Sequence, residues 1–276
     1  MTREALTAST DALRAAGIDE PRLDAELLLA AATGWDRARL VAQPGAAIPP
    51  AASRRFAEMV RRRLRREPVA YILGRRGFRR LELAVDPRVL IPRPETELLV
   101  ELALELSPGS VLDVGTGSGA IALAIADELP QCAVTAVDTS AAALELAREN
   151  AERAGLTSRV ELALGTLPPA QGGFELVVAN LPYVSEAEWN GLQPEVREWE
   201  PREALLAGAD GLDAIRAVVP ALAGSAEVLA LEVGAGQAGA VGELLLAAGF
   251  GAIETRADLA GIPRVVIGRS RGASVA

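Results

Sequence analysis

Two short stretches of the sequence contain residue types that could carry out chemistry. The first, residues 111–121, predicts a buried strand, a turn with glycines at alternate positions and the start of an apolar helix. Glycine has no Cβ, so this turn can bend sharply and bring its backbone close to a ligand, while the helix behind it offers free N–H groups. The arrangement predicts a cofactor site. The residues expected to contribute to it are Asp113, Gly115, Thr116, Gly117, Ser118 and Gly119.

The position of Asp113 distinguishes between two possible cofactors. Gly115, Gly117 and Ala120 fit the loose glycine pattern of dinucleotide-binding folds, and a second carboxylate, Asp138, lies near the expected ribose-binding distance. However, a carboxylate about 4 Å from a pyrophosphate would cost about 4 kcal/mol at an effective dielectric of about 20, whereas a sulfonium or ammonium group would be attracted by as much. The pattern therefore favours S-adenosylmethionine over NAD, with Asp138 accepting hydrogen bonds from the ribose hydroxyls.

The second stretch, Asn180-Leu181-Pro182-Tyr183, ends another predicted strand. The Asn180 side chain and the Leu181 backbone provide two carbonyl oxygens that could hold both hydrogens of one NH2 group, beside the flat face of Tyr183. An amide or amino-purine nitrogen is a weak nucleophile, and fixing its hydrogens would turn its lone pair toward an electrophilic methyl group. A β-turn with a capping asparagine is the alternative interpretation. We expect these four residues to bind substrate and carry the catalysis, with Asn180 also touching the cofactor.

Composition limits the chemistry that this chain can perform. Its 276 residues include no histidine, and all 28 basic residues are arginine, which excludes histidine-based catalysis, a P-loop lysine and a pyridoxal Schiff base. The single cysteine, Cys132, excludes a disulfide framework, and no metal site is expected. No apolar run approaches the roughly 20 residues of a membrane helix, and the first residues do not resemble a signal peptide. We therefore expect a cytoplasmic protein without membrane contact.

Charge is distributed unevenly along the chain. Residues 1–94 contain 18 arginines and 11 acidic residues, whereas the remainder contains 10 arginines and 26 acidic residues. This asymmetry suggests two parts with different partners. A helix predicted at 52–67 carries an arginine run, which is either a solvated face or a docking surface for an acidic or RNA-associated partner. The run consists of Arg54, Arg55, Arg61, Arg62, Arg63, Arg65 and Arg66.

Hydrophobic periodicity divides the chain into three parts. Short amphipathic helices are predicted for residues 1–68, which we expect to form a helical substrate-recognition domain, and a β-hairpin linker is predicted for residues 69–94. From residue 95 to 276 the pattern alternates between strands and helices, as in a doubly wound α/β sheet whose ligands bind at the carboxyl ends of the strands. The predicted strands are 110–115, 133–138, 159–164, 174–179, 226–233, 252–256 and 264–268, and the helices are 117–129, 140–155, 211–223 and 237–249. The last two strands are joined without a helix, so one of them is expected to be antiparallel, an ending typical of class I, Rossmann-like methyltransferases.

These motifs together resemble those of the (N/D)PPY amino-group methyltransferases. The flanking segments 67–74, 90–97, 200–205 and 258–266 are similar to those of the peptide chain release factor glutamine methyltransferases, known as PrmC or HemK. The resemblance covers essentially the whole chain, and Ile-Pro-Arg-Pro-Glu-Thr-Glu at 91–97 is its most specific part. It implies N5-methylation of the glutamine in the Gly-Gly-Gln motif of class I release factors, using S-adenosylmethionine. Arg93 is expected near the rim of the substrate cleft.

Two positions depart from the family pattern. Leu181 stands in place of the usual first proline, but its backbone carbonyl is retained, so we expect activity to be retained. Gly165-Thr166 stands where relatives often carry an acidic residue and an aromatic near the adenine, and Thr166 remains the expected cofactor contact there.

Two alternative functions remain open. A nucleic-acid methyltransferase acting on adenine N6 or guanine N2 would use the same chemistry, although the acidic composition of the catalytic part argues against direct nucleic-acid binding. A non-catalytic scaffold that binds release factor or ribosome would keep the fold but need not keep the intact motif at 180–183.

Overall fold

The computed structural model describes residues 1–167 and 173–270, which form two compact units. One contains residues 1–75 together with 193–199, and we call it the helical unit. The other contains the remaining described residues, and we call it the sheet unit. The last residues of the predicted C-terminal domain, 271–276, lie outside the described part of the chain. Within that part, no helix has the length and apolar character needed to cross a membrane.

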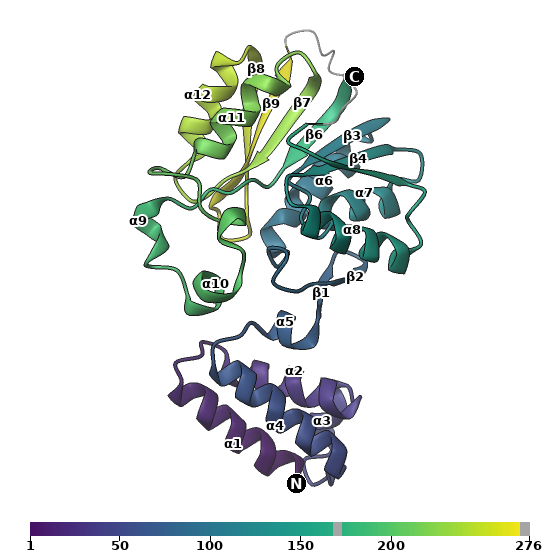
Figure 1. The fold of residues 1–276 in the computed structure, drawn as a ribbon, viewed down its shortest axis with the longest axis vertical. Coiled ribbons are helices and arrows are strands. Elements are labelled where there is room, and N and C mark those ends of the chain that lie inside the picture. Colours follow the sequence, from purple (N-terminus) through teal and green to yellow (C-terminus); the bar gives the residue numbers. More distant parts are fainter. Residues whose placement is uncertain (168–172, 271–276) are drawn as a thin grey trace. The chain divides into compact units, whose positions relative to one another are not determined.

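The helical unit is built from short helices around a small apolar core (Figure 1). Its helices are α1 (Thr2–Ala15), α2 (Pro21–Thr33), α3 (Arg37–Ala42), α4 (Pro50–Leu64), α5 (Val69–Leu73) and α10 (Pro194–Trp199). Helix α2 packs against both α1 and α4. Apolar side chains at helical spacing, including Leu13, Leu28 and Phe56, are buried between them. The helical expectation for this region is confirmed.

The start of the predicted hairpin is helical, which corrects the sequence analysis. Residues 69–73 form α5, and only β1 (Arg75–Phe78) and β2 (Leu81–Ala84) pair as a two-stranded sheet. Pro68 precedes α5, and Gly74 ends it in the left-handed conformation at φ 69°. Proline before the first turn and a left-handed glycine after the last are helix-boundary signals. Here they override the β-propensity of Val69 and Ile72.

The sheet unit contains a seven-stranded sheet in the order β5-β4-β3-β6-β7-β9-β8. Its strands are β3 (Ser110–Val114), β4 (Ala133–Asp138), β5 (Val160–Leu164), β6 (Phe174–Ala179), β7 (Ala226–Glu232), β8 (Phe250–Ala257) and β9 (Pro263–Ser270). Strand β9 pairs antiparallel with both of its neighbours, whereas the pairings among β3 to β7 are parallel. The doubly wound sheet and the antiparallel strand near its end are both as predicted.

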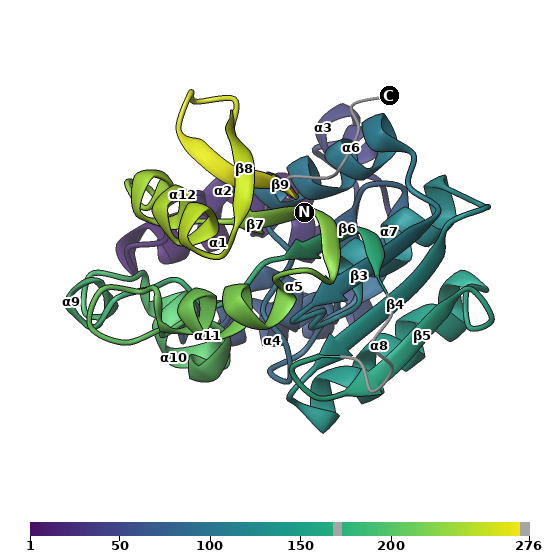
Figure 2. The ribbon, with the colours of Figure 1, turned by 90° about the horizontal axis from the view of Figure 1, so that it is seen from above.

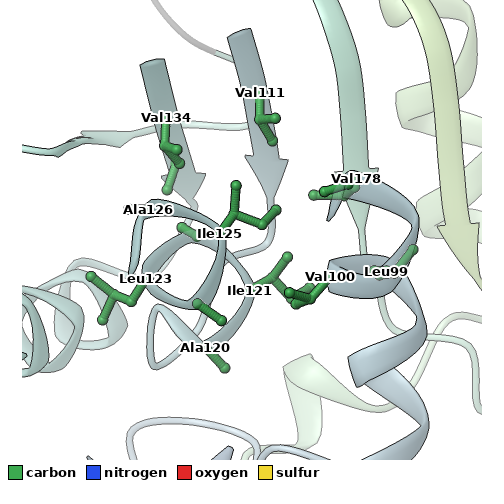
Figure 3. Packing of buried hydrophobic residues seen from close by; sticks show 14 of the residues in the cluster. Leu99, Val100, Val111, Ala120, Ile121, Leu123, Ile125, Ala126, Val134 and Val178 are labelled. Carbon is green, nitrogen blue, oxygen red and sulfur yellow. The ribbon is translucent and has the colours of Figure 1, made fainter. Parts of the chain in front are cut away.

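Helices cover the two faces of this sheet. The longer ones are α6 (Glu97–Leu106), α7 (Ala120–Glu128), α8 (Ala141–Ala154), α11 (Asp213–Leu222) and α12 (Ala238–Ala247), and shorter turns are η1 (Pro94–Thr96), α9 (Glu186–Trp189) and η2 (Arg202–Ala204). Helices α6 and α7 share one apolar cluster, in which Ile125 lies beside Val111 of β3 and Ile121 lies beside Val100 of α6 (Figure 3). Helices α11 and α12 lie side by side and share the apolar cluster of the opposite face (Figure 2).

The strand order reverses between β3 and β6, which are parallel neighbours in the middle of the sheet. Chain connections leave these two strands toward opposite sides of the sheet, so a crevice forms at their carboxyl ends. The glycine turn follows β3, and the residues 180–183 follow β6. The fold therefore brings together the two stretches that were singled out from the sequence.

Candidate active site

A pocket lies at the carboxyl ends of β3 and β6 and contains most of the predicted site residues. Those that line it are Gly115, Thr116, Gly117, Ser118, Asp138, Thr166, Asn180, Leu181 and Pro182. Those that do not line it are Asp113, Gly119, Tyr183 and Arg93. Segments 88–92 and 201–204 complete the walls, so two of the flanking segments that support the family resemblance also meet here.

The glycine turn has the geometry of a close backbone approach. Gly115 and Gly117 have φ values of 76° and 55°, in the left-handed region that favours glycine. A Cβ on Gly115 would lie 3.3 Å from the Leu181 side chain, so the absence of a side chain lets the two motifs touch. The Gly115 and Thr116 N–H groups both donate to the Val137 carbonyl, at 2.9 and 3.0 Å, which fixes the turn to β4.

Asp138 holds the same turn from the end of β4. Its Oδ2 accepts a hydrogen bond from the Gly117 N–H, and its Oδ1 accepts one from the Ser140 N–H, both at 2.8 Å. The Ser140 hydroxyl, in turn, caps α8 by accepting from Ala143. Each carboxylate oxygen has a second lone pair, so Asp138 can still accept hydrogen bonds from a ligand in the pocket.

Asp113 is not placed to attract a cofactor directly, which corrects the electrostatic argument made from the sequence. Its side chain is fully buried, and Oδ2 accepts hydrogen bonds from the Thr116 hydroxyl at 2.6 Å and the Ala122 N–H at 3.2 Å. Burial raises its pKa to about 7, against the effect of those hydrogen bonds. Asp113 therefore joins the glycine turn to the first turn of α7 rather than facing the pocket. The position of Asp113 along the chain does not fix the direction of its side chain, which depends on the packing of α7 against β3.

The residues after β6 are held individually. The Asn180 Nδ2 donates to the Thr96 hydroxyl at 3.1 Å, while Leu181 is buried against the glycine turn. The Tyr183 carbonyl accepts from Gln237 Nε2 at 2.9 Å, and burial raises the pKa of the Tyr183 phenol to about 12. Tyr183 is therefore neutral and fixed in place, suited to packing or to donating a hydrogen bond but not to acting as a base.

Arg93 has an intramolecular partner. Its guanidinium pairs with Glu200, whose buried carboxylate also accepts from the Ile91 N–H at 2.9 Å. Residues 201, 203 and 204, which follow Glu200 directly, line the pocket. The interaction therefore joins segment 91–97 to the wall formed by segment 201–204, and the proposed contact of Arg93 with substrate stays a prediction.

Four residues that support the site were not identified from the sequence: Thr96, Asn150, Glu232 and Gln237. The Asn150 amide pairs with both backbone groups of Ala84 and donates to the Ser118 carbonyl at 2.9 Å, so it links the hairpin to the glycine turn. Gln237 accepts from the Gly234 N–H while holding Tyr183. Only Thr96 offered a signal, because it lies within the most specific family segment.

Most of the arginine run on α4 is occupied within the protein. Arg62 pairs with Glu67, and the buried Arg63 pairs with both Asp24 and Glu195. Arg66 also pairs with Glu195. Arg54 and Arg65 are exposed and form no ion pair among residues 1–167 and 173–270. The run is thus partly structural, and a docking surface on α4 is limited to its exposed members.

Comparison with known proteins places the chain in a family. A model of the PrmC N-terminal domain matches residues 4–74, and a model described as a methyltransferase domain matches residues 111–199. A release factor glutamine methyltransferase of Geobacter sulfurreducens is 44% identical over 260 residues, covering 92% of this chain and 91% of that protein. Another, of Caulobacter vibrioides, is 40% identical over 274 residues, covering 96% and 95%. The chain belongs to the release factor glutamine methyltransferase family.

Solved structures agree on the fold of the sheet unit. The catalytic domain of hMettl16 in complex with MAT2A 3'UTR hairpin 6 has a TM-score of 0.58 and is 14% identical, covering 71% of this chain and 77% of that one. The N-terminal domain of human METTL16 in complex with SAH has a TM-score of 0.51 at 13% identity, covering 68% and 75%. At such low identity the likeness establishes the class I methyltransferase fold and nothing about the substrate.

Proposed function

We propose that this protein methylates the side-chain nitrogen of the glutamine in the Gly-Gly-Gln motif of class I release factors, with S-adenosylmethionine as the methyl donor. The observation that carries the proposal is the junction of Gly115 with Leu181, which brings a cofactor turn and an amide-binding motif to one pocket. The similarity to release factor glutamine methyltransferases over more than 90% of the chain supports the same substrate.

The pocket suits S-adenosylmethionine in its polar groups and in its shape. Asp138 offers carboxylate lone pairs for ribose hydroxyls, and the glycines at 115 and 117 let the backbone approach the ligand closely. Thr166 lines the far wall, where Gly165 has a φ of 144° that a side chain would strain. When bound, the cofactor supplies a methyl group on a positively charged sulfur, so the protein needs no general base as strong as histidine.

The residues 180–183 would then orient the nucleophile. We assign Asn180 Oδ1 and the Leu181 carbonyl as acceptors for the two hydrogens of the glutamine amide. Pro182 stiffens the turn, and Tyr183, which follows it outside the pocket lining, is the proposed aromatic contact for the substrate. Because an amide nitrogen is poorly nucleophilic, holding its hydrogens and excluding water supply the rate enhancement. Glycines next to the target glutamine would let the substrate loop enter without side-chain clash.

Recognition of the whole release factor would fall to the helical unit. Arg54 on α4 and Arg65 directly after it are exposed cations that are free to meet an acidic surface on the substrate. Deleting residues 1–68 does not test this role cleanly, because α10 packs with those residues and would lose its partners. Reversing the exposed charges, Arg54→Glu with Arg65→Glu, should raise KM for intact release factor about tenfold while leaving cofactor affinity unchanged. Arg3→Glu, also exposed but on α1, is the matched control.

The proposed function is tested by mass spectrometry of candidate substrates after incubation with labelled S-adenosylmethionine. Intact release factor should gain one methyl group on the glutamine of its Gly-Gly-Gln loop, and an isolated loop peptide should react far more slowly. A release factor carrying Gly-Gly-Ala in that loop is the control and should stay unlabelled. Labelled DNA or RNA with unlabelled release factor would favour the nucleic-acid alternative. We propose a cytoplasmic location, because translation terminates in the cytoplasm.

A further inference from the structure

The Asn180 side chain has a defined polarity in this site. Its Nδ2 donates to the Thr96 hydroxyl at 3.1 Å, and Thr96 is buried at the end of η1. A carboxamide has an acceptor side and a donor side, and the proposed reaction distinguishes between them. The oxygen can hold an N–H of the substrate amide, whereas the NH2 group would oppose it with a second donor. Turning the Asn180 amide by 180° would therefore disable the site without moving the backbone.

Thr96 fixes this polarity only if its own hydrogen is committed elsewhere. A hydroxyl has one hydrogen and two lone pairs, so a free Thr96 could donate to Asn180 Oδ1 as readily as it accepts from Nδ2. The Glu232 carboxyl lies close to this hydroxyl, since an interaction with Thr96 lowers the pKa of Glu232 against the larger effect of burial. When Glu232 is ionised, its carboxylate can only accept, so Thr96 then donates its hydrogen to Glu232 and presents lone pairs to Asn180.

Strand register explains why Glu232 is within reach. Strands β6 and β7 are parallel, with Ala179 beside Leu231, so the next residues along each strand are Asn180 and Glu232. Glu232 is only 2% exposed and forms no ion pair among residues 1–167 and 173–270. The nearby cations have partners of their own, Arg93 with Glu200 and Arg264 with Asp258. Burying a carboxyl without a neutralising partner makes folding less favourable. No ion pair among the described residues offsets that cost for Glu232.

We propose that Glu232 and Thr96 are positioning residues that set the orientation of the Asn180 amide. Glu232 takes the Thr96 hydrogen, Thr96 then accepts from Asn180 Nδ2, and Asn180 Oδ1 is left facing the pocket. The inference rests on the proposed function, because it assigns Asn180 Oδ1 to the substrate nitrogen. It adds that the motif after β6 depends on residues from two other segments of the chain.

The test compares Thr96→Val with Thr96→Ser under saturating cofactor and intact release factor. Valine keeps the shape and removes the hydroxyl, so kcat should fall 10-fold to 100-fold with cofactor affinity and thermal unfolding nearly unchanged. Serine keeps the hydroxyl and should retain kcat within about threefold. Equal losses in both variants, or full activity in Thr96→Val, would overturn the proposal.

A second measurement separates positioning from packing. Glu232→Met removes the acceptor at similar size and should lower kcat as much as Thr96→Val does. Glu232→Gln retains an oxygen that can take the Thr96 hydrogen and should be milder. The double variant Thr96→Val/Glu232→Met should be no slower than either single variant, because both break one chain of hydrogen bonds. Multiplied losses would refute the relay alone, whereas unlabelled release factor with unaltered enzyme would refute the proposed function itself.

Discussion

In the helical unit, the buried carboxylate of Asp24 and the half-buried carboxylate of Glu195 both face the guanidinium of Arg63. In the sheet unit, Asp113 and Glu232 are buried more completely but form no ion pair among the described residues. The pKa of each of these two carboxyls is raised to about 7, mainly because the groups are buried. The helical unit thus neutralises the charge that it buries, and the strand ends of the sheet unit do not.

This difference distinguishes buried charges that stabilise the fold from isolated buried carboxyls that support a functional site. A buried ion pair joins elements that are distant in the chain, as Arg63 joins α4 to α2 and α10. An isolated buried carboxyl makes folding less favourable, and such groups persist where they orient a site. Asp113 supports the cofactor turn, and Glu232 lies beside the end of β6.

Removing the shared cation of the helical unit should cost the most stability. Arg63→Ala leaves the buried carboxylate of Asp24 unpaired and leaves Glu195 with Arg66 alone, so the free energy of unfolding should fall by about 3–5 kcal/mol. Denaturant unfolding measures the change. Arg54→Ala, on the exposed face of the same helix, is the control and should change stability by less than about 0.5 kcal/mol. A small effect of Arg63→Ala would mean that the ion pairs are not structural.

The unpaired carboxyls should make the protein less stable as the pH rises. Burial raises the pKa of Glu232 from 4.5 to about 7, so between these values the folded state binds more protons than the unfolded chain. The free energy of unfolding should therefore decline across that window, with Glu232 contributing roughly 3 kcal/mol. The Glu232→Gln variant has no titrating group at this position. The contribution of Glu232 to the pH dependence of the free energy of unfolding should therefore disappear. The exposed replacement Glu145→Gln should leave the slope as it was.

Changing the amide acceptor at the strand end should affect turnover rather than stability. Asn180→Ala removes one of two proposed acceptors for the substrate NH2 group, so kcat should fall at least about 100-fold, roughly 2.7 kcal/mol in the barrier. Steady-state kinetics with intact release factor measures this loss. Cofactor affinity by calorimetry is the internal control and should change little. Full activity in this variant would remove Asn180 from the mechanism.

Asp138 is expected to act on cofactor binding with a smaller effect. Asp138→Asn keeps the shape of the side chain but loses the charged acceptor, so affinity for the cofactor should weaken by about 1.5–3 kcal/mol. The hydrogen bonds to Gly117 and Ser140 are partly lost as well, which adds to the effect. Calorimetry with the demethylated cofactor provides the measurement. NAD should not bind to either form, and tight NAD binding would overturn the cofactor assignment.

The smallest effect is expected at Leu181, where the sequence departs from the family pattern. Leu181→Pro keeps the backbone carbonyl that is proposed to hold the substrate, so kcat should remain within about threefold of the unaltered value. The buried leucine packs against the glycine turn, and its loss should lower stability by about 1 kcal/mol. Kinetics and thermal unfolding of one preparation provide both values. A large loss of kcat would mean that the leucine side chain itself shapes the site.

Local patterns in the sequence were sufficient for the fold and for the position of the site. Alternating strands and helices predicted the doubly wound sheet. The absence of a helix between the last two strands predicted that one of them is antiparallel. The glycine turn at 115–119 and the motif at 180–183 lie where parallel strands of such a sheet end. These features could be predicted because periodicity and turn chemistry depend on neighbouring residues, and the ends of parallel strands meet at one edge.

The directions of side chains and the partners of charges were decided only by the tertiary structure. Asp113 turns into the interior, because the first turn of α7 offers it an N–H donor nine residues later in the chain. Residues 193–199 join the helical unit, because Glu195 meets Arg63 and Arg66. Thr96 and Asn180 are 84 residues apart, and the register of β6 and β7 places Glu232 beside Asn180. Such contacts depend on packing between distant segments, which no window of sequence contains.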